Sequence, residues 1–113
     1  MKIPNEMRKT LEGKIVAFSS IKDAIYPNAI AVEINKVIED NKVLITDNYM
    51  NQTLNDIKQN QNVAILIWNN ERSYKLLGEA QYYTEGSYYE MVKPLNDGYP
   101  CKGVIVVEIK AII

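Results

Sequence analysis

Residues 73–83 read SYKLLGEAQYY, and this alternating stretch decides the class of fold. Side chains along a strand point to opposite faces in turn, so the small and apolar residues fall mainly on one face and the polar residues on the other. Gly78 lies in the middle of the stretch, where it predicts a bend or bulge of the kind that a barrel needs at its corners. We therefore expect one long, curved strand here.

Shorter strands and helices are predicted on both sides of this stretch. The turn signal Glu-Asp-Asn at residues 39–41 is expected to join two of the strands into a hairpin. The chain lacks the regular strand–helix alternation of a parallel sheet. It therefore favours a mainly β (α+β) fold, a small antiparallel barrel of six strands with two or three short helices. The other five strands are expected at residues 15–20, 29–37, 42–46, 63–69 and 103–112, and the helices near 4–12, 52–59 and 86–95.

Length and composition define the general class of protein. The 113 residues suit a single domain over 1–113, and 47% hydrophobic with 24% charged residues is typical of a globular chain. Thirteen Lys and Arg against fourteen Asp and Glu give no basic excess, which argues against a nucleic-acid partner. Apolar runs such as residues 63–68 are too short to cross a bilayer, and the charged start MKIPNE is unlike a signal peptide.

The residue types that the chain lacks exclude several kinds of catalytic chemistry. The chain has no histidine and one cysteine, Cys101. Ser-His-Asp and Cys-His catalysis are therefore excluded, and so are most zinc sites. A single cysteine suits a reducing compartment, and we expect a cytoplasmic protein. Any redox chemistry would have to be carried by a bound cofactor.

A polar corner is predicted where residues 46–54, TDNYMNQTL, join the end of a strand to the start of a helix. The first turn of a helix presents unpaired N–H groups and a partial positive charge, which together suit a phosphate. Asn51, Gln52 and Thr53 are expected at that turn. The alternative is that Asn51 only caps the helix. Asp47 is the one carboxylate in this segment, and we expect it to brace the loop.

A second informative stretch is YPNAIAV at residues 26–32. Ala29 and Ala31 alternate with larger apolar residues, and a face of alanines allows a flat aromatic ligand to lie against the strand backbone. The alternative is that these alanines pack beneath a helix. Trp68, at the end of a predicted strand, is a candidate for stacking on a ligand, or else a core or interface residue.

Taken together, these segments resemble the pyridoxamine 5′-phosphate oxidase-related FMN-binding proteins. The resemblance rests on Pro27-Asn28, on residues 46–60, on the strand 63–68 and on the Gly-Glu-Ala segment that begins at Gly78. It covers about residues 5–110, nearly the whole chain. It implies a split β-barrel that forms a homodimer and binds FMN at the dimer interface.

The resemblance also implies roles for individual residues. A strand flanks the isoalloxazine ring and the ribityl chain, the next strand lines the site, and the helix start holds the phosphate. Many relatives carry a basic residue just before the threonine, where this chain has Gln52; losing such a charge-assisted bond costs about 1–3 kcal/mol. Lys22, Lys58, Arg72 and Lys75 are candidates to replace that charge. With Asp47 and Trp68 added from the reading of the residues themselves, the candidate cofactor-binding set is Asn28, Ala29, Ile30, Ala31, Val32, Ile45, Thr46, Asp47, Asn51, Gln52, Thr53 and Trp68.

Three functions follow from these expectations. The first is an FMN-dependent oxidoreductase, with a nicotinamide nucleotide as a candidate electron donor. The second is a non-catalytic FMN carrier that exchanges electrons with a redox partner protein. The third is a split barrel that binds another planar ligand, which the neutral Gln52 keeps open.

Overall fold

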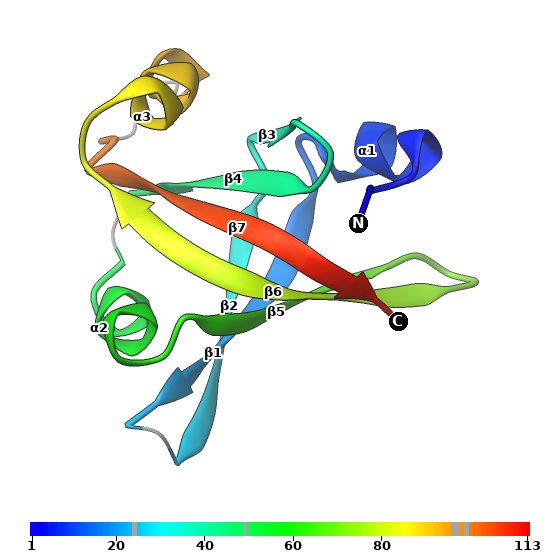
Figure 1. The fold of residues 1–113 in the computed structure, drawn as a ribbon, viewed down its shortest axis with the longest axis horizontal. Coiled ribbons are helices and arrows are strands. Elements are labelled where there is room, and N and C mark those ends of the chain that lie inside the picture. The colour runs from blue at the N-terminus through cyan, green and yellow to red at the C-terminus, as the bar shows by residue number, and fades with distance from the viewer. Residues whose placement is uncertain (24, 49, 96–97, 99) are drawn as a thin grey trace.

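The strand predicted at residues 73–83 is the central strand of a single antiparallel sheet (Figure 1). The computed structural model describes residues 1–23, 25–48, 50–95, 98 and 100–113. Within these ranges seven strands follow the order β2-β1-β5-β6-β7-β4-β3. The strands are β1 (Ile15–Lys22), β2 (Tyr26–Glu33), β3 (Lys36–Ile38), β4 (Lys42–Asp47), β5 (Asn62–Trp68), β6 (Ser73–Tyr83) and β7 (Gly103–Ile112). The helices are α1 (Asn5–Leu11), α2 (Gln52–Gln59) and α3 (Ser87–Val92), with a 3-10 turn at Lys93–Leu95.

The bend predicted at Gly78 is present. The register between β6 and β7 shifts between Leu77 and Gly78. A Cβ atom on Gly78 would collide with the carbonyl oxygen of Glu108 and press on the side chain of Val107. The two strands approach this closely only because residue 78 has no side chain.

The strand predicted over residues 29–37 is two strands in the structure. Its first part belongs to β2, which begins earlier, at Tyr26, and pairs with β1 along its whole length. Its last part is β3, which pairs with β4 at the opposite edge of the sheet. Asn35 lies at the break, where its Oδ1 accepts hydrogen bonds from both the backbone N–H and the hydroxyl of Thr46, each at 2.8 Å. The expected hairpin with residues 42–46 is therefore reduced to β3–β4, and the strand count is seven rather than six.

Because β2 and β3 follow each other in sequence yet lie at opposite edges, the sheet must curl on itself, as Figure 1 shows. No ladder joins the two edges in the described part of the chain, so the barrel is split. Its inner faces supply one apolar core that includes Phe18, Ile65, Leu76 and Val107. The sheet positions α2 beside β1, and this junction builds the site described next.

None of the helices in the described ranges is long and apolar enough to cross a bilayer. Those ranges also hold no cluster of three or more His, Cys, Asp or Glu side chains that would suit a metal ion.

Candidate functional site

A groove of about 840 Å³ runs between β2, the end of β4 and the start of α2. Its volume lies within the roughly 300–1,000 Å³ usual for small-molecule and cofactor pockets. The two segments singled out in the sequence meet here, although more than a dozen residues separate them along the chain. The predicted residues that line this groove are Asn28, Ile30, Ala31, Val32, Thr46, Asn51, Gln52 and Thr53.

Four of the predicted residues lie elsewhere. Ala29 is on the outer face of β2, paired with Ser19 of β1. Ile45 and Asp47 are completely buried in β4. Trp68 lines a different pocket, at the far end of β5, so the structure does not bring it together with the groove residues.

A buried hydrogen-bond network forms the floor of the groove. The Asn28 amide donates to Thr53 Oγ1 at 3.2 Å and to Ser20 Oγ at 3.3 Å. The Ser20 hydroxyl donates in turn to Asp56 Oδ2 at 2.8 Å, and the Gln52 amide donates to Asp56 Oδ1 at 2.7 Å. Ser20, Thr53 and Asp56 are nearly inaccessible to solvent. The network therefore locks β1, β2 and the first turn of α2 together.

Sequence analysis missed Ser20 and Asp56, although both carried a signal. Asp56 follows Gln52 by four residues and Thr53 by three, so a helix places all three on one side. Ser20 follows Phe18 by two residues, which places it on the inward face of β1. A polar residue at a core position needs a partner, and the buried carboxylate of Asp56 provides it.

The start of α2 is open to the groove. Asn51 occupies the N-cap position, but no side-chain hydrogen bond caps the helix, so the simple capping alternative is wrong. Asn51 and Gln52 are both exposed to solvent. The donors of the first helical turn, with the partial positive charge of the helix, can therefore meet an anionic group. Tyr49, part of the same segment, lies outside the described residues.

The described lining of the groove offers no cation to neutralise such an anion. Among the described residues that line it, Glu33 is the one charged side chain. None of the four candidate replacements, Lys22, Lys58, Arg72 and Lys75, belongs to the lining. A phosphate at the start of α2 would thus be held by neutral hydrogen-bond donors. The groove still fits a flavin in size, in its flat strand wall and in its helix-start corner.

Asp47 fixes the loop between β4 and α2. Its Oδ1 accepts the backbone N–H of Met50 at 2.8 Å, and its Oδ2 accepts the hydroxyl of Tyr82 at 2.6 Å. Burial, and next the hydrogen bond to Asp47, raise the pKa of Tyr82 above its ordinary value, so the phenol remains a donor. Gly103, opposite Asp47, leaves room for the Tyr82 ring, which a side chain at residue 103 would strike. Both carboxylate oxygens are thus engaged in bracing.

The comparison with protein families shows which family this chain belongs to. The model described as "Pyridoxamine 5′-phosphate oxidase" matches residues 3–111. The chain belongs to the pyridoxamine 5′-phosphate oxidase family. This confirms the resemblance found in the sequence and agrees with the split barrel described above.

Three similar proteins show how far the likeness extends. The uncharacterized protein MJ0282 of Methanocaldococcus jannaschii is 37% identical over 119 residues, which span 99% of this chain and 80% of MJ0282. The crystal structure of HupZ from Group A Streptococcus is 25% identical, with a TM-score of 0.85 over 97% of this chain and 91% of HupZ. An FMN-binding protein from Syntrophomonas wolfei is 17% identical, with a TM-score of 0.78 over 96% of this chain and 85% of its own. At that identity the last structure shows the shared fold alone.

Proposed function

We propose that the protein binds FMN in the groove and acts as a flavin-dependent oxidoreductase. The observation that carries the proposal is the bond between Asn28 and Thr53, which joins the flat wall of β2 to the open first turn of α2 inside one groove. A ring and an anionic tail are the two parts of FMN, and the groove provides one surface for each. The description of the Syntrophomonas wolfei relative as an FMN-binding protein supports the same assignment.

The chain's own residues position and shield the cofactor. Bound flavin would supply hydride and electron transfer, a chemistry that cofactors rather than protein side chains carry. Ala31 leaves space for a ring beside the β2 backbone, and Ile30 and Val32, whose side chains point to the opposite face of this edge strand, also belong to the lining. Asn51, Gln52 and Thr53 hold the phosphate through neutral donors at the helix start.

The proposal includes a homodimer. The outer face of the sheet carries small and apolar side chains that the described chain leaves at least partly exposed, among them Ala17, Ala64 and Leu66. This face is continuous with the groove, because Ile15 and Ala31 belong to both. A second copy of the chain would cover the face and give the open groove its second wall.

The dimer is tested by light scattering of the purified protein. We expect the mass of two chains, and we expect Ala64→Glu, which places a charge on the outer face, to shift the mass toward one chain. Asn55→Glu introduces the same charge at an exposed position of α2, outside the sheet, and should leave the dimer intact. A monomer with flavin bound would contradict this part of the proposal.

Flavin binding is tested by absorbance and titration. Freshly purified protein should be yellow or should take up added FMN, and NADH or NADPH should bleach the bound flavin. Failure to bind FMN would overturn the proposal. Binding with chemical reduction but no bleaching would favour the second candidate, a carrier that exchanges electrons with a partner protein.

One observation favours a third candidate, a planar ligand with an uncharged tail. The described lining of the groove offers no cation, and a dianion at the helix start gains only from neutral donors. Riboflavin, which lacks the phosphate, separates the two cases. Equal affinity for riboflavin and FMN would assign the groove to ligands with uncharged tails.

For the location of the protein we propose the cytoplasm, because the lone Cys101 suits a reducing compartment.

A further inference from the structure

The start of α2 has a buried carboxylate beneath it. Asp56 lies four residues after Gln52 on the helix and is almost fully buried. Its Oδ1 accepts the Gln52 amide at 2.7 Å, and its Oδ2 accepts the Ser20 hydroxyl at 2.8 Å. Residues four apart on a helix are neighbours, with about 5–6 Å between their Cβ atoms. An anion bound at the helix start would therefore lie close to this carboxylate.

Asp56 also fixes the orientation of the Gln52 amide. A carboxylate only accepts hydrogen bonds, so Nε2 of Gln52 faces Asp56, and the carbonyl oxygen Oε1 is the end that remains. Gln52 is exposed and lines the groove, and no donor within the described chain reaches its Oε1. A doubly charged phosphate has oxygens that only accept, so it gains little from a side chain that offers it an oxygen and one remaining N–H.

The other acidic groups around the helix start add negative charge. Glu33, on β2, is the one charged side chain of the described groove lining. Asp47, at the end of β4, is buried behind the loop that leads to α2. The helix itself supplies only a partial positive charge of about half a unit at its start. The carboxylate of Asp56 therefore outweighs the helix charge unless a cation lies nearby.

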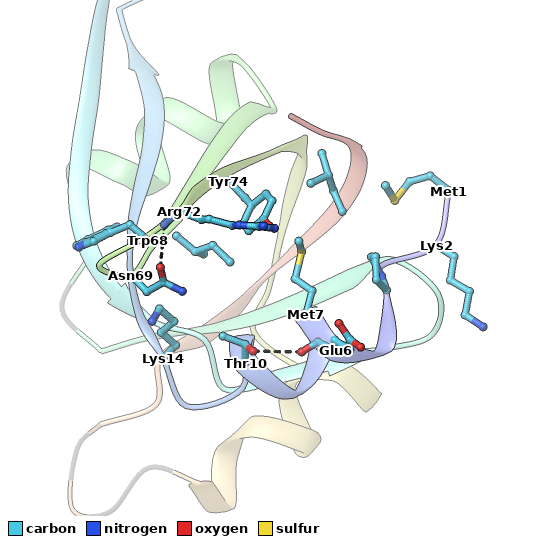
Figure 2. A pocket seen from close by; sticks show the side chains of 13 residues that line it. Met1, Lys2, Glu6, Met7, Thr10, Lys14, Trp68, Asn69, Arg72 and Tyr74 are labelled. Atoms are coloured by element: carbon cyan, nitrogen blue, oxygen red, sulfur yellow. Dashed lines mark hydrogen bonds between the residues drawn. The ribbon is translucent and has the colours of Figure 1, made fainter.

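The described cations lie outside the groove. Those on the segments that border it are Lys14, Lys22, Lys36, Lys58, Lys93 and Lys102, and none belongs to the described lining or forms an ion pair with another described residue. Lys14 lines a separate pocket of about 620 Å³ with Lys2 and Arg72, between α1 and the turn that joins β5 to β6 (Figure 2). That pocket shares no lining residue with the groove, so its cations do not offset Asp56.

We propose that the groove selects a flavin whose tail carries one negative charge over a flavin whose tail carries two. The inference rests on the proposed function, because it concerns the same site. Asp56 is the positioning residue, since it repels a second charge and turns the Gln52 amide. A phosphate monoester such as FMN gains its second charge at a pKa of about 6. A phosphate diester carries one charge on both sides of that pH, so a diester and a protonated monoester share the selected chemistry.

The composition of the chain makes this charge preference measurable. The chain has no histidine, so no side chain has an ordinary pKa between pH 6 and pH 8, and the change of pH titrates the phosphate of FMN. Fluorescence titration at both pH values compares FMN with riboflavin, which has no phosphate, and with the methyl ester of FMN, which is a diester. We expect FMN to bind at least tenfold more weakly at pH 8 than at pH 6, and the affinities of riboflavin and the ester to stay constant.

Variants show whether Asp56 sets the preference. Asp56→Asn removes the charge and keeps an acceptor for the Ser20 hydroxyl, so FMN affinity at pH 8 should rise at least threefold while riboflavin affinity stays constant. Asp40→Asn removes the same charge from an exposed turn at the other end of β4 and should change nothing. Gln52→Lys, at an exposed position, provides a second test that keeps Asp56 in place, and its gain for FMN should be larger at pH 8 than at pH 6. Thermal melting checks the fold of each variant.

The outcomes separate this inference from the proposed function. Equal FMN affinity at pH 6 and pH 8, a pH dependence that riboflavin shares, or a pH dependence that neither variant alters would overturn the inference alone. Failure of every flavin to bind at either pH would overturn the proposed function and the inference with it.

The methyl ester distinguishes the two sources of a single charge. If the ester binds at pH 8 as tightly as FMN binds at pH 6, the result supports selection by charge and includes diesters among the ligands. If FMN keeps its pH dependence and the ester binds weakly at both pH values, the result supports the protonated monoester, whose O–H can donate to Gln52 Oε1.

Discussion

The side-chain amide of Asn28 donates a hydrogen bond to the hydroxyl of Thr53, with 3.2 Å between Nδ2 and Oγ1. This contact joins the edge strand β2 to the first turn of α2, and the two residues are 25 positions apart in the sequence. It holds the helix start against β2. The proposed flavin site therefore depends on a tertiary contact between two segments, each of which looks ordinary alone.

The double substitution Asn51→Ala and Thr53→Ala should weaken FMN binding at least tenfold and keep the fold, while the lost Asn28–Thr53 bond lowers the free energy of unfolding by about 1 kcal/mol. It removes two polar side chains from the helix start, and tenfold corresponds to about 1.4 kcal/mol. Fluorescence titration of FMN measures the effect, and Asn55→Ala, exposed on the same helix, is the control. Unchanged affinity would place the phosphate elsewhere.

Gln52→Lys should strengthen FMN binding by roughly tenfold and leave riboflavin binding unchanged. The substitution adds a cation beside the phosphate position, and a charge-assisted bond contributes about 1–3 kcal/mol. Titration with both flavins isolates the contribution of the phosphate. Gln59→Lys, exposed at the other end of α2, changes the charge equally without approaching the groove. A gain for riboflavin as large as that for FMN would disprove a phosphate at Gln52.

Asp56→Ala should lower the free energy of unfolding by about 1–3 kcal/mol, because it leaves the buried hydroxyl of Ser20 without its acceptor. The amide of Gln52 loses its partner as well, so FMN affinity should fall with stability. Urea denaturation measures the first effect and flavin titration the second. The neighbouring exposed Asn55→Ala should show neither, and wild-type stability in Asp56→Ala would mean that the network is not required.

Tyr82→Phe should destabilise the protein by about 1–3 kcal/mol at neutral pH, since it leaves one oxygen of the buried Asp47 without a donor. The pKa of Tyr82 is raised in the folded state, first by burial and then by Asp47. The folded protein therefore keeps the phenol protonated where the unfolded chain, with an ordinary pKa of about 10, loses its proton.

Wild-type stability should accordingly decrease as the pH rises above about 10, and Tyr82→Phe should lack that part of the decrease. Chemical denaturation at pH 8 and pH 11 compares the two proteins. Tyr26→Phe, at an exposed position, serves as the matched control and should follow the wild type. Identical pH dependence in all three proteins would show that Tyr82 does not contribute.

Cys101 should react with iodoacetamide more slowly than a free cysteine at pH 8. Burial, as the main cause, raises the pKa of its thiol, so a smaller fraction is present as the reactive thiolate. Mass spectrometry follows the alkylation, and the same protein in urea should react at the rate of a free cysteine. Equal rates in the folded and unfolded protein would contradict this expectation.

Several features were predictable because they depend on residues close together in sequence. The alternation across residues 73–83 sufficed to place the central strand, and Gly78 to place its bend, since strand periodicity and the glycine rule are local. The boundaries of α2 were equally predictable from its start and its helical spacing. Residues 29–37 were not, because an alternating stretch does not reveal that its two ends pair with different strands.

The candidate site divides in the same way. The sequence by itself determined that residues 29–32 belong to a strand and that residues 51–53 begin a helix, because periodicity and helix-start chemistry are encoded locally. Only the tertiary structure decided that the two meet in one groove, that Asp56 and Ser20 lie beneath it, and that Trp68 belongs to a different pocket. The physical reason is that curling the sheet sets which strand ends become neighbours, and the curl depends on contacts distant in sequence, such as Asn35 with Thr46.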